Sequence, residues 1–389
     1  MRLAERRLRL DVGLAAFRDL WHPQPFREIR PAWCERWPAL AAELLALPDE
    51  TVRHLNDDGG ASLAWLARHL PEAGEIGALT ELPACAAQRL PDLGPHWAWE
   101  IPGRKRAQIE AFAAAAARSG KEVFDWCGGK GHLGRLLALQ WGARATSLDI
   151  DPALCAEGRE LAQRAGVDHE FLVADALAAG EQLSDRHHVV ALHACGNLHR
   201  TAIRAAAERG LAALDVAPCC YHRGVEEAYR PLAAGASLQL SRDDIRLAVT
   251  ETVTASPRQA WRRDRDMAWK LGFDALRRAV TGEGYRPFKP VPPAWFSGSF
   301  EQFIGAMARR EGLALPPSFN ADEFERRGWQ RQREVMGLSV VRHAFRRAIE
   351  VWLALDLAAH LESGGYEVGL GTFCPRQLTP RNLLLSARR

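Results

Sequence analysis

A glycine-rich segment at residues 125–134 (DWCGGKGHLG) has the residue types and the spacing of a cofactor-binding turn. It follows a short apolar run at 123–124 and leads into residues 133–139, whose apolar pattern predicts the start of a helix. Glycines let a backbone turn sharply and approach a ligand closely. A strand, a glycine turn and a helix in this order are typical of the first unit of a nucleotide-binding α/β fold.

The acidic residue Asp125, at the end of the predicted strand, indicates which cofactor the turn favours. A carboxylate there would repel a pyrophosphate but suits a cationic, phosphate-free cofactor such as S-adenosylmethionine. The Gly-Lys-Gly at 129–131 lacks the Ser or Thr that follows Lys in a P-loop, which excludes that motif. Glycines 129, 131 and 134 partly match a dinucleotide-binding turn, so an NAD-dependent oxidoreductase remains an alternative.

Further polar residues stand where later predicted strands end. Strand patterns at 145–148, 170–173, 189–192 and 212–217 alternate with helical patterns, which favours a parallel, doubly wound sheet. In such sheets ligands bind in a crevice outside the carboxyl ends of the strands. We therefore expect the residues that follow these strands to meet at one site.

Two aspartates in this register are expected to hold a nucleoside. Asp149 lies about 18–20 residues beyond the glycines, where a carboxylate commonly accepts hydrogen bonds from ribose hydroxyls. Asp175 is expected to accept from the adenine amino group, while the backbone of Ala176 contacts the ring. Either aspartate alone could be a helix cap. The predicted cofactor-binding residues are Asp125, Cys127, Gly129, Lys130, Gly131, Asp149, Ile150, Asp175 and Ala176.

Soft and titratable side chains follow the fourth and fifth predicted strands: His193, Cys195, Cys219, Cys220 and His222. Zinc binding, plain core packing and a substrate-side role remain open for them. We expect no metal, because no Cys-x-x-Cys spacing is present and the adjacent cysteines cannot easily both bind one tetrahedral ion.

A substrate-side role would make proton removal the main chemistry of this second group. His222 or Tyr221 would take a proton from the substrate nucleophile as the methyl group transfers. His193 would face the sulfonium of the cofactor, and a cysteine nucleophile would need a lowered pKa. The predicted catalytic residues are His222, Tyr221, Cys219 and His193.

Composition restricts the partners and the compartment. The chain has 389 residues, a net charge of +3 and eight scattered cysteines, so neither a bulk electrostatic partner nor a disulfide framework is indicated. The N-terminus has no apolar export segment, and no run of about 18 apolar residues exists, so we expect a cytoplasmic protein without a membrane partner. Basic runs at 104–106, 262–263, 309–310, 326–327 and 346–347 are explained either by solvated helix faces or by nucleic-acid contact.

Four segments together resemble those of a group of class I methyltransferases. They are 125–133 (DWCGGKGHL), 192–198 (LHACGNL), 219–222 (CCYH) and 379–383 (TPRNL). The chain resembles the methyltransferase-like family whose eukaryotic members are labelled ribosomal RNA adenine dimethylase domain-containing proteins, and is more distantly similar to ribose-methylating tRNA enzymes. Cys127 stands where that family has its first glycine, which bears on cofactor binding.

The resemblance implies an α/β fold with a Rossmann-like, seven-stranded methyltransferase sheet. A helical N-terminal region and a helical insertion before the last two strands would be added to it. The expected parts are the N-terminal region 1–103, the core 104–240, the insertion 241–335, and the final helix with a β-hairpin 336–389.

The resemblance further implies an S-adenosylmethionine-dependent methyltransferase with RNA, tRNA in particular, or protein as its substrate. The alternatives are a non-catalytic RNA- or ligand-binding protein of the same fold and the NAD-dependent oxidoreductase.

Capping boxes at 241–244 and 299–302 predict helix starts in the insertion. The helical pattern over 321–361 is expected to break near Gly337.

Overall fold

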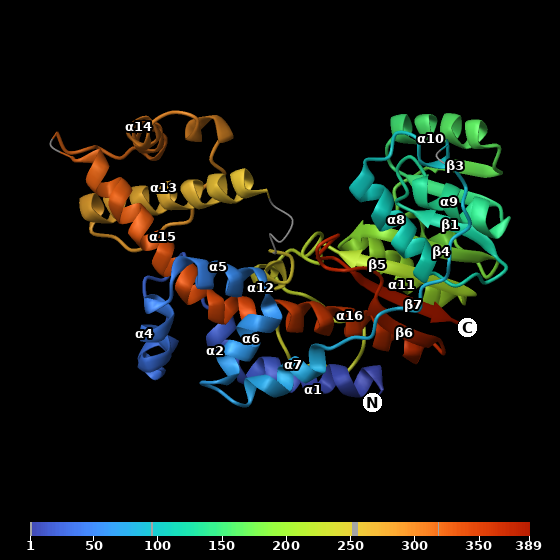
Figure 1. Cartoon of the computed structure of the whole chain (residues 1–389), viewed down its shortest axis with the longest axis horizontal. Coiled ribbons are helices and arrows are strands. Elements are labelled where there is room, and N and C mark those ends of the chain that lie inside the picture. The colour runs from blue at the N-terminus through green and yellow to red at the C-terminus, as the bar shows by residue number, and fades with distance from the viewer. Residues whose placement is uncertain (1, 95, 251–255, 318) are drawn as a thin grey trace. The chain divides into compact units, whose positions relative to one another are not determined.

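A computed structural model describes residues 2–94, 96–250, 256–317 and 319–389 (Figure 1). The chain divides into two compact units, each assembled from segments that are distant in sequence. The sheet unit contains Met1–Ala15, Ile76–Thr254 and Arg346–Arg389, and the helical unit contains Ala16–Glu75 and Ala255–Phe345. This division differs from the four consecutive ranges expected above, because helices of the N-terminal region pack on a helix of the insertion.

The sheet unit is built on seven strands, which confirms the predicted fold class. Their spatial order is β3 (His169–Val173), β2 (Ala145–Asp149), β1 (Glu122–Trp126), β4 (His187–Cys195), β5 (Ala213–Cys219), β7 (Leu383–Arg388) and β6 (Glu367–Thr372). Strands β1 to β5 are parallel, and β7 pairs antiparallel with both β5 and β6. The strand order reverses between β1 and β4, which is where doubly wound sheets bind ligands.

Helices cover the sheet and bury its apolar residues. In the sheet unit they are α1 (Leu3–Ala16), α7 (Ala73–Thr80), α8 (Gly103–Ala115), α9 (His132–Trp141), α10 (Pro152–Ala165), α11 (Asn197–Arg209), α12 (Arg242–Leu247) and α16 (Arg346–Ser363), with short 3-10 turns at His96–Ala98 and Ala179–Gln182. One core cluster joins α8 and α9 to the central strands through Phe112, Leu137 and Val123. Helices α11 and α16 contact each other and the strands β4 and β6, respectively.

A buried carboxylate fixes the N-terminal helix to this unit. Asp11 of α1 accepts hydrogen bonds from the indole N–H of Trp352 at 3.1 Å and from the backbone N–H of Ser237 at 2.9 Å. It is only 2% exposed. Because a buried carboxylate without partners is costly, these bonds explain why the first helix is part of the sheet unit.

The helical unit packs around a long helix, α15 (Ala321–Ala344). Its other helices are α2 (Arg18–Trp21), α3 (Trp33–Arg36), α4 (Pro38–Ala46), α5 (Asp49–Asp57), α6 (Gly59–Ala67), α13 (Pro257–Thr281), α14 (Phe300–Glu311) and a 3-10 turn at Pro293–Phe296. Helix α15 contacts α4, α5, α6 and α13. Aromatic side chains, including Trp269, Phe273 and Phe303, form the core between α13 and α14.

Helix starts in the insertion are confirmed, and one predicted break is wrong. Ser241 and Ser299 each form the expected capping box. The long helix breaks at Phe345 instead of Gly337, which lies inside α15. A Cβ at Gly337 would lie 3.0 Å from the carbonyl oxygen of Leu44, so this glycine permits close packing against α4.

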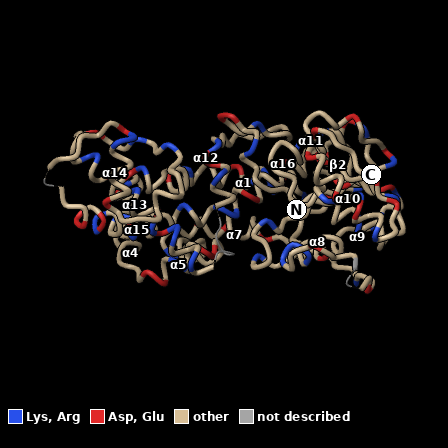
Figure 2. The backbone as a smooth tube through the Cα atoms, turned by 90° about the horizontal axis from the view of Figure 1, so that it is seen from above, with Lys and Arg blue, Asp and Glu red and all other residues tan. Residues whose placement is uncertain are grey.

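Lys and Arg residues and Asp and Glu residues are scattered along the chain (Figure 2). Two of the basic runs pair with partly exposed acids on the same helix, Arg106 with Glu110 and Arg327 with Glu323, which favours the interpretation as solvated helix faces for these two. The run at 346–347 differs, because Arg346 is buried and Arg347 pairs with the buried Glu350. Among the described helices, none is long and apolar enough to cross a membrane.

The close packing of α13 against α15 leads to a prediction about stability. A Cβ at Gly328 would overlap the carbonyl oxygen of Ala268, so Gly328→Ala is expected to lower the free energy of unfolding by about 1–3 kcal/mol. Gly305→Ala in α14 is the matched control, because its Cβ would meet only the end of the Arg309 side chain, at 3.4 Å. Helix propensity then predicts a gain of up to about 1 kcal/mol. Urea denaturation measures both, and a gain in both variants would contradict the packing argument.

Candidate functional site

The carboxylate of Asp125 at the end of β1 lies inside the glycine turn. Its Oδ2 accepts from the backbone N–H of Gly134 at 3.0 Å and from the hydroxyl of Ser147 at 3.1 Å. The side chain is buried, and this burial raises its pKa to about 6. Asp125 therefore shapes the turn from within and does not present its carboxylate at the surface.

The positions of the turn require glycine for different physical reasons. A Cβ at Gly128 would lie 2.5 Å from Asp125 Oδ2, and one at Gly131 would lie 2.6 Å from the ring of His169. A Cβ at Gly134 would lie 3.1 Å from that of Asp125. These three allow the helix α9 to approach the strands. At Gly129 a Cβ would make only ordinary contacts, with Leu154 Cδ1 at 3.9 Å and Asp149 Oδ2 at 4.0 Å, so the requirement for glycine there is its positive φ of 57°.

Left-handed backbone conformations gather at the strand ends. Of four described non-glycine residues with positive φ, three are Cys127 (φ 58°), His193 (φ 66°) and Cys220 (φ 44°); the fourth is Glu100. They stand just after β1, within β4, and just after β5, which are adjacent strands. Because such conformations cost free energy for residues with a Cβ, their gathering at one sheet edge points to a functional site.

Asp149 at the end of β2 holds the turn from the other side. Its Oδ2 accepts from the N–H of Gly129 at 2.9 Å, and its Oδ1 accepts from the N–H of Asp151 at 3.0 Å. The carboxylate is half-buried, so it keeps lone pairs toward solvent. It is therefore placed beside Gly129 and can accept further hydrogen bonds.

Exposed apolar side chains flank this carboxylate. Ile150 directly follows Asp149 and is 66% exposed, and Leu177 after β3 is 54% exposed. Ala176 is buried, and exposed Asp175 accepts from the N–H of Leu177 at 2.9 Å. This surface of apolar groups beside a free carboxylate fits a flat heteroaromatic ring with an amino group. Sequence reasoning missed Leu177, whose only signal is an apolar residue in a turn.

The thiol of Cys127 is affected by charged groups at several strand ends. Burial and, to a smaller extent, the charges of Asp149, Asp125, Cys195 and Asp175 together raise the pKa of its thiol to about 12. These residues lie at or just after the carboxyl ends of β1, β2, β3 and β4, which are parallel neighbours in the sheet, so they stand at one edge of it.

Two of the predicted cofactor-binding residues, Lys130 and Gly131, contact other parts of the protein. Lys130 forms an ion pair with Glu157 on α10. Gly131 donates its N–H to the carbonyl of Gly128 at 3.0 Å and packs on His169. Their observed contacts are therefore structural, holding the turn to α10 and β3.

Among the predicted catalytic residues, His193 is fixed by a residue that the sequence did not indicate. Its Nε2 lies 3.2 Å from Oε1 of Gln108 on α8, and its buried Nδ1 has no hydrogen-bond partner among the described residues. Burial lowers the pKa of His193 to about 4, so the imidazole is neutral at pH 7. Gln108 lies in a helix before the turn, where spacing gives no signal.

Tyr221 and His222 differ in their access to a substrate. Tyr221 is 1% exposed, packs against His199 with ring centroids 5.4 Å apart, and burial raises its pKa well above the ordinary value. It does not fit the predicted role of proton acceptor. His222 is half-buried, burial lowers its pKa, and its Nδ1 has no partner within the described part of the chain.

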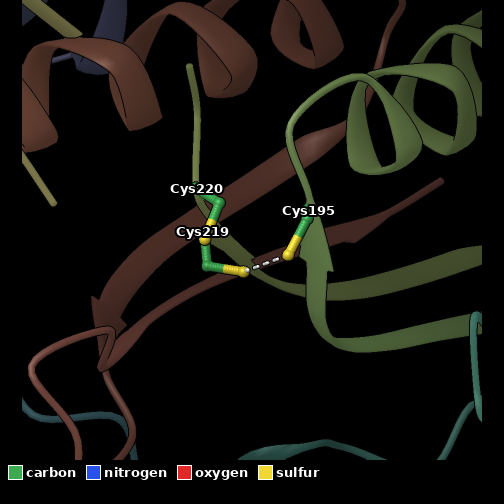
Figure 3. Close-up of side chains that lie close together, drawn as sticks. All are labelled: Cys195, Cys219 and Cys220. Carbon is green, nitrogen blue, oxygen red and sulfur yellow. Dashed lines mark hydrogen bonds between the residues drawn. The ribbon is translucent and has the colours of Figure 1, made fainter. Parts of the chain in front are cut away.

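Three thiols converge beside these histidines. The sulfur atoms of Cys195 and Cys219 lie 3.5 Å apart and face each other across β4 and β5 (Figure 3). The sulfur atoms of Cys195, Cys219 and Cys220 all lie within 4.8 Å of one another. Interaction with the Cys219 thiol lowers the pKa of Cys220 to about 5 and also lowers that of Cys195.

The structure disfavours a dinucleotide at this turn. A pyrophosphate would bind the free N–H groups at the start of the helix that follows the glycines. One of these groups, on Gly134, is already bonded to Asp125, whose carboxylate is mostly ionised at pH 7 because its pKa is about 6. The NAD-dependent alternative would therefore have one N–H group fewer for its phosphates and an ionised carboxylate beside them.

The strand order, the antiparallel β7 and the site at the β1–β4 reversal define a Rossmann-like methyltransferase sheet. Residues 104–227 match a family model described as a methyltransferase domain. A search of curated proteins finds no match.

Solved methyltransferase structures show remote likeness. A Pyrococcus abyssi tRNA (uracil-54, C5)-methyltransferase with S-adenosyl-L-homocysteine is 18% identical over 30% of this chain and 28% of its own, with a TM-score of 0.24. An rRNA methylase from Streptococcus thermophilus is 14% identical over 34% and 89%, with a TM-score of 0.24. An O-methyltransferase family protein from Burkholderia thailandensis is 15% identical over 85% and 71%, with a TM-score of 0.29. The fold assignment rests on the strand order.

The raised pKa of Asp125 predicts how stability depends on pH. The folded protein binds this proton more tightly than the unfolded chain, so Asp125 lowers stability as pH rises from about 4 to 6. Asp125→Asn keeps an acceptor for Gly134 and removes this titration. The free energy of unfolding of the variant relative to wild type should rise by about 2 kcal/mol between pH 4 and 7. Denaturation at several pH values measures it, and a pH-independent difference would contradict it.

Proposed function

We propose that this chain is an S-adenosylmethionine-dependent methyltransferase that acts on RNA, tRNA in particular, or on protein. The observation that carries the proposal is the gathering of strained residues and acidic side chains at the ends of β1, β2, β3, β4 and β5. The match of residues 104–227 to a methyltransferase domain supports it.

The nucleoside half of the cofactor would lie over the ends of β2 and β3. Asp149 would accept from the ribose hydroxyls, and Asp175 from the adenine amino group. Ile150 and Leu177 would cover the ring, which accounts for their exposure. A Cβ at Gly129 would lie 4.0 Å from Asp149 Oδ2, so the absence of a side chain there leaves the backbone of the turn close to this carboxylate and to the proposed ribose position. The negative charges around Cys127 suit a cationic sulfonium better than a phosphate.

The chain's chemical task is to position the two reactants and to remove a proton. S-adenosylmethionine supplies an activated methyl group when it is bound, and in-line approach of the nucleophile requires orientation. His222 is the proposed proton acceptor, because its ring is half-buried and its Nδ1 is unpartnered among the described residues. His193 has a positioning role through Gln108.

A polar pocket is lined in part by residues 224–230, which follow His222 in the sequence, and its polarity supports a polar substrate. It has a volume of about 360 Å³ and is lined by Arg200, Arg204 and the loop that includes Arg230. Arg200 is buried, stacks over Tyr229 at 4.6 Å, and has an Nη1 without a hydrogen-bond partner among the described residues. Guanidinium groups bind phosphate and carboxylate alike, and Glu226 and Glu227 also line the pocket, so its lining suits a polar group and carries charges of both signs.

Labelling tests the activity and the substrate class together. Methyl-labelled S-adenosylmethionine is mixed with the purified chain and with RNA or protein from a strain that lacks its gene. Label is expected in one fraction, and mass spectrometry then identifies the modified atom. Cofactor binding without label in either fraction would instead support the non-catalytic alternative.

Asp149→Ala is expected to weaken S-adenosylmethionine binding on the order of 10–100-fold, since hydrogen bonds to a charged group contribute about 1.5–3 kcal/mol. Calorimetric titration measures the dissociation constant. Asp151→Ala is the matched control: that carboxylate caps α10 through Ala153, at 2.8 Å, so its loss should cost about 1 kcal/mol of stability without changing affinity. Equal affinities in the two variants would exclude Asp149 from the site.

His222→Ala should retain cofactor affinity while kcat falls about 10²–10⁴-fold, the range typical of a lost general base. Affinity and turnover are measured on the same preparation, with the labelled fraction as substrate. Full turnover would remove His222 from the mechanism and leave solvent as the proton acceptor.

A further inference from the structure

The thiols of Cys195, Cys219 and Cys220 form a cluster that methyl transfer does not require. Their sulfur atoms lie within 4.8 Å of one another, and the closest pair is 3.5 Å apart. Core packing would not need three sulfur atoms at one point. The cluster spans two neighbouring strands, with Cys195 at the end of β4 and Cys219 at the end of β5 (Figure 3).

Adjacent cysteines on a regular strand could not share a ligand, because successive side chains point to opposite faces. The structure removes this objection. Strand β5 ends at Cys219, and Cys220 adopts a left-handed conformation with φ 44°, which breaks the alternation. The turn after Cys220 packs closely against the start of α11. Gly196 makes this approach possible, because a Cβ built on it would overlap the carbonyl oxygen of Arg223.

We propose that Cys195, Cys219 and Cys220 bind one zinc ion through their three sulfur atoms, with the fourth coordination position open. Zinc bonds to sulfur at about 2.3 Å, which places tetrahedral sulfur ligands about 3.8 Å apart. The observed separations, from 3.5 Å to within 4.8 Å, bracket that value, so small side-chain movements complete the site.

The charge of the site is partly balanced by its surroundings. Three thiolates and Zn²⁺ carry a net charge of −1; burial disfavours the charged form of all three thiols, and the guanidinium of Arg223 favours that of Cys195 and Cys220 to a smaller extent. The ion replaces the thiol protons, which leave for solvent. No redox partner is involved. Three protein ligands with a free position are the arrangement of catalytic rather than structural zinc sites.

Cobalt substitution tests the site on the untagged full chain. The reduced, metal-free protein is titrated with Co²⁺ and then with Zn²⁺. We expect sulfur-to-cobalt charge-transfer absorption that saturates at one equivalent and disappears when Zn²⁺ displaces the cobalt. Cys195→Ser should weaken zinc binding on the order of 100-fold or more. Cys374→Ser is the matched control, because this half-buried cysteine lies outside the cluster and should leave both spectra unchanged.

Alkylation of the wild-type protein gives a second readout that needs no variant to fold. Zn²⁺ should slow modification of Cys195 and Cys220 by N-ethylmaleimide, as resolved by peptide mass spectrometry, and leave Cys374 unaffected. Absence of the charge-transfer band, or equal alkylation with and without Zn²⁺, would overturn the proposal. Both readouts are independent of methyl transfer, so the metal site and the proposed activity can fail separately.

Discussion

The site depends on the buried carboxylate of Asp125. It joins β1 to β2 through the Ser147 hydroxyl and to α9 through the Gly134 amide, so three elements are fixed by one group. A carboxylate at that point leaves no room for a Cβ at Gly128. The turn is thereby held in place, and the amide of Gly129 reaches Asp149 at 2.9 Å. Two acids, one buried and one accessible, thus set the shape and the polarity of the turn.

Much of the fold follows from the sequence because periodic patterns and turn residues are local. The five parallel strands, the final hairpin and the capping boxes at Ser241 and Ser299 were predictable in this way. The break at Phe345 was not, because Gly337 looks like a helix breaker until the carbonyl of Leu44 is beside it. The pairing of residues 16–75 with 255–345 was also hidden, since long-range packing leaves no local signal.

The candidate site was predictable in its location and less so in its details. Asp149 ends β2 and Asp175 follows β3, and these strands are parallel neighbours, so the strand patterns placed both residues at one edge of the sheet. The inward direction of Asp125, the burial of Tyr221 and the left-handed backbone at Cys220 depend on tertiary packing. The last of these reverses the sequence argument against a shared ligand for adjacent cysteines. Side-chain direction at the end of a strand cannot be deduced from alternation once the strand has stopped.

The central claim is that the ends of β1, β2 and β3 hold the nucleoside and that β4 and β5 face the reacting methyl group. A crystal structure with S-adenosylhomocysteine tests it most directly. We expect the ribose hydroxyls on Asp149, the adenine between Ile150 and Leu177, and the sulfur directed toward His193 and Cys195. Ligand density away from these strand ends, or a turn closed over Gly129 so that no ligand binds, would contradict the account.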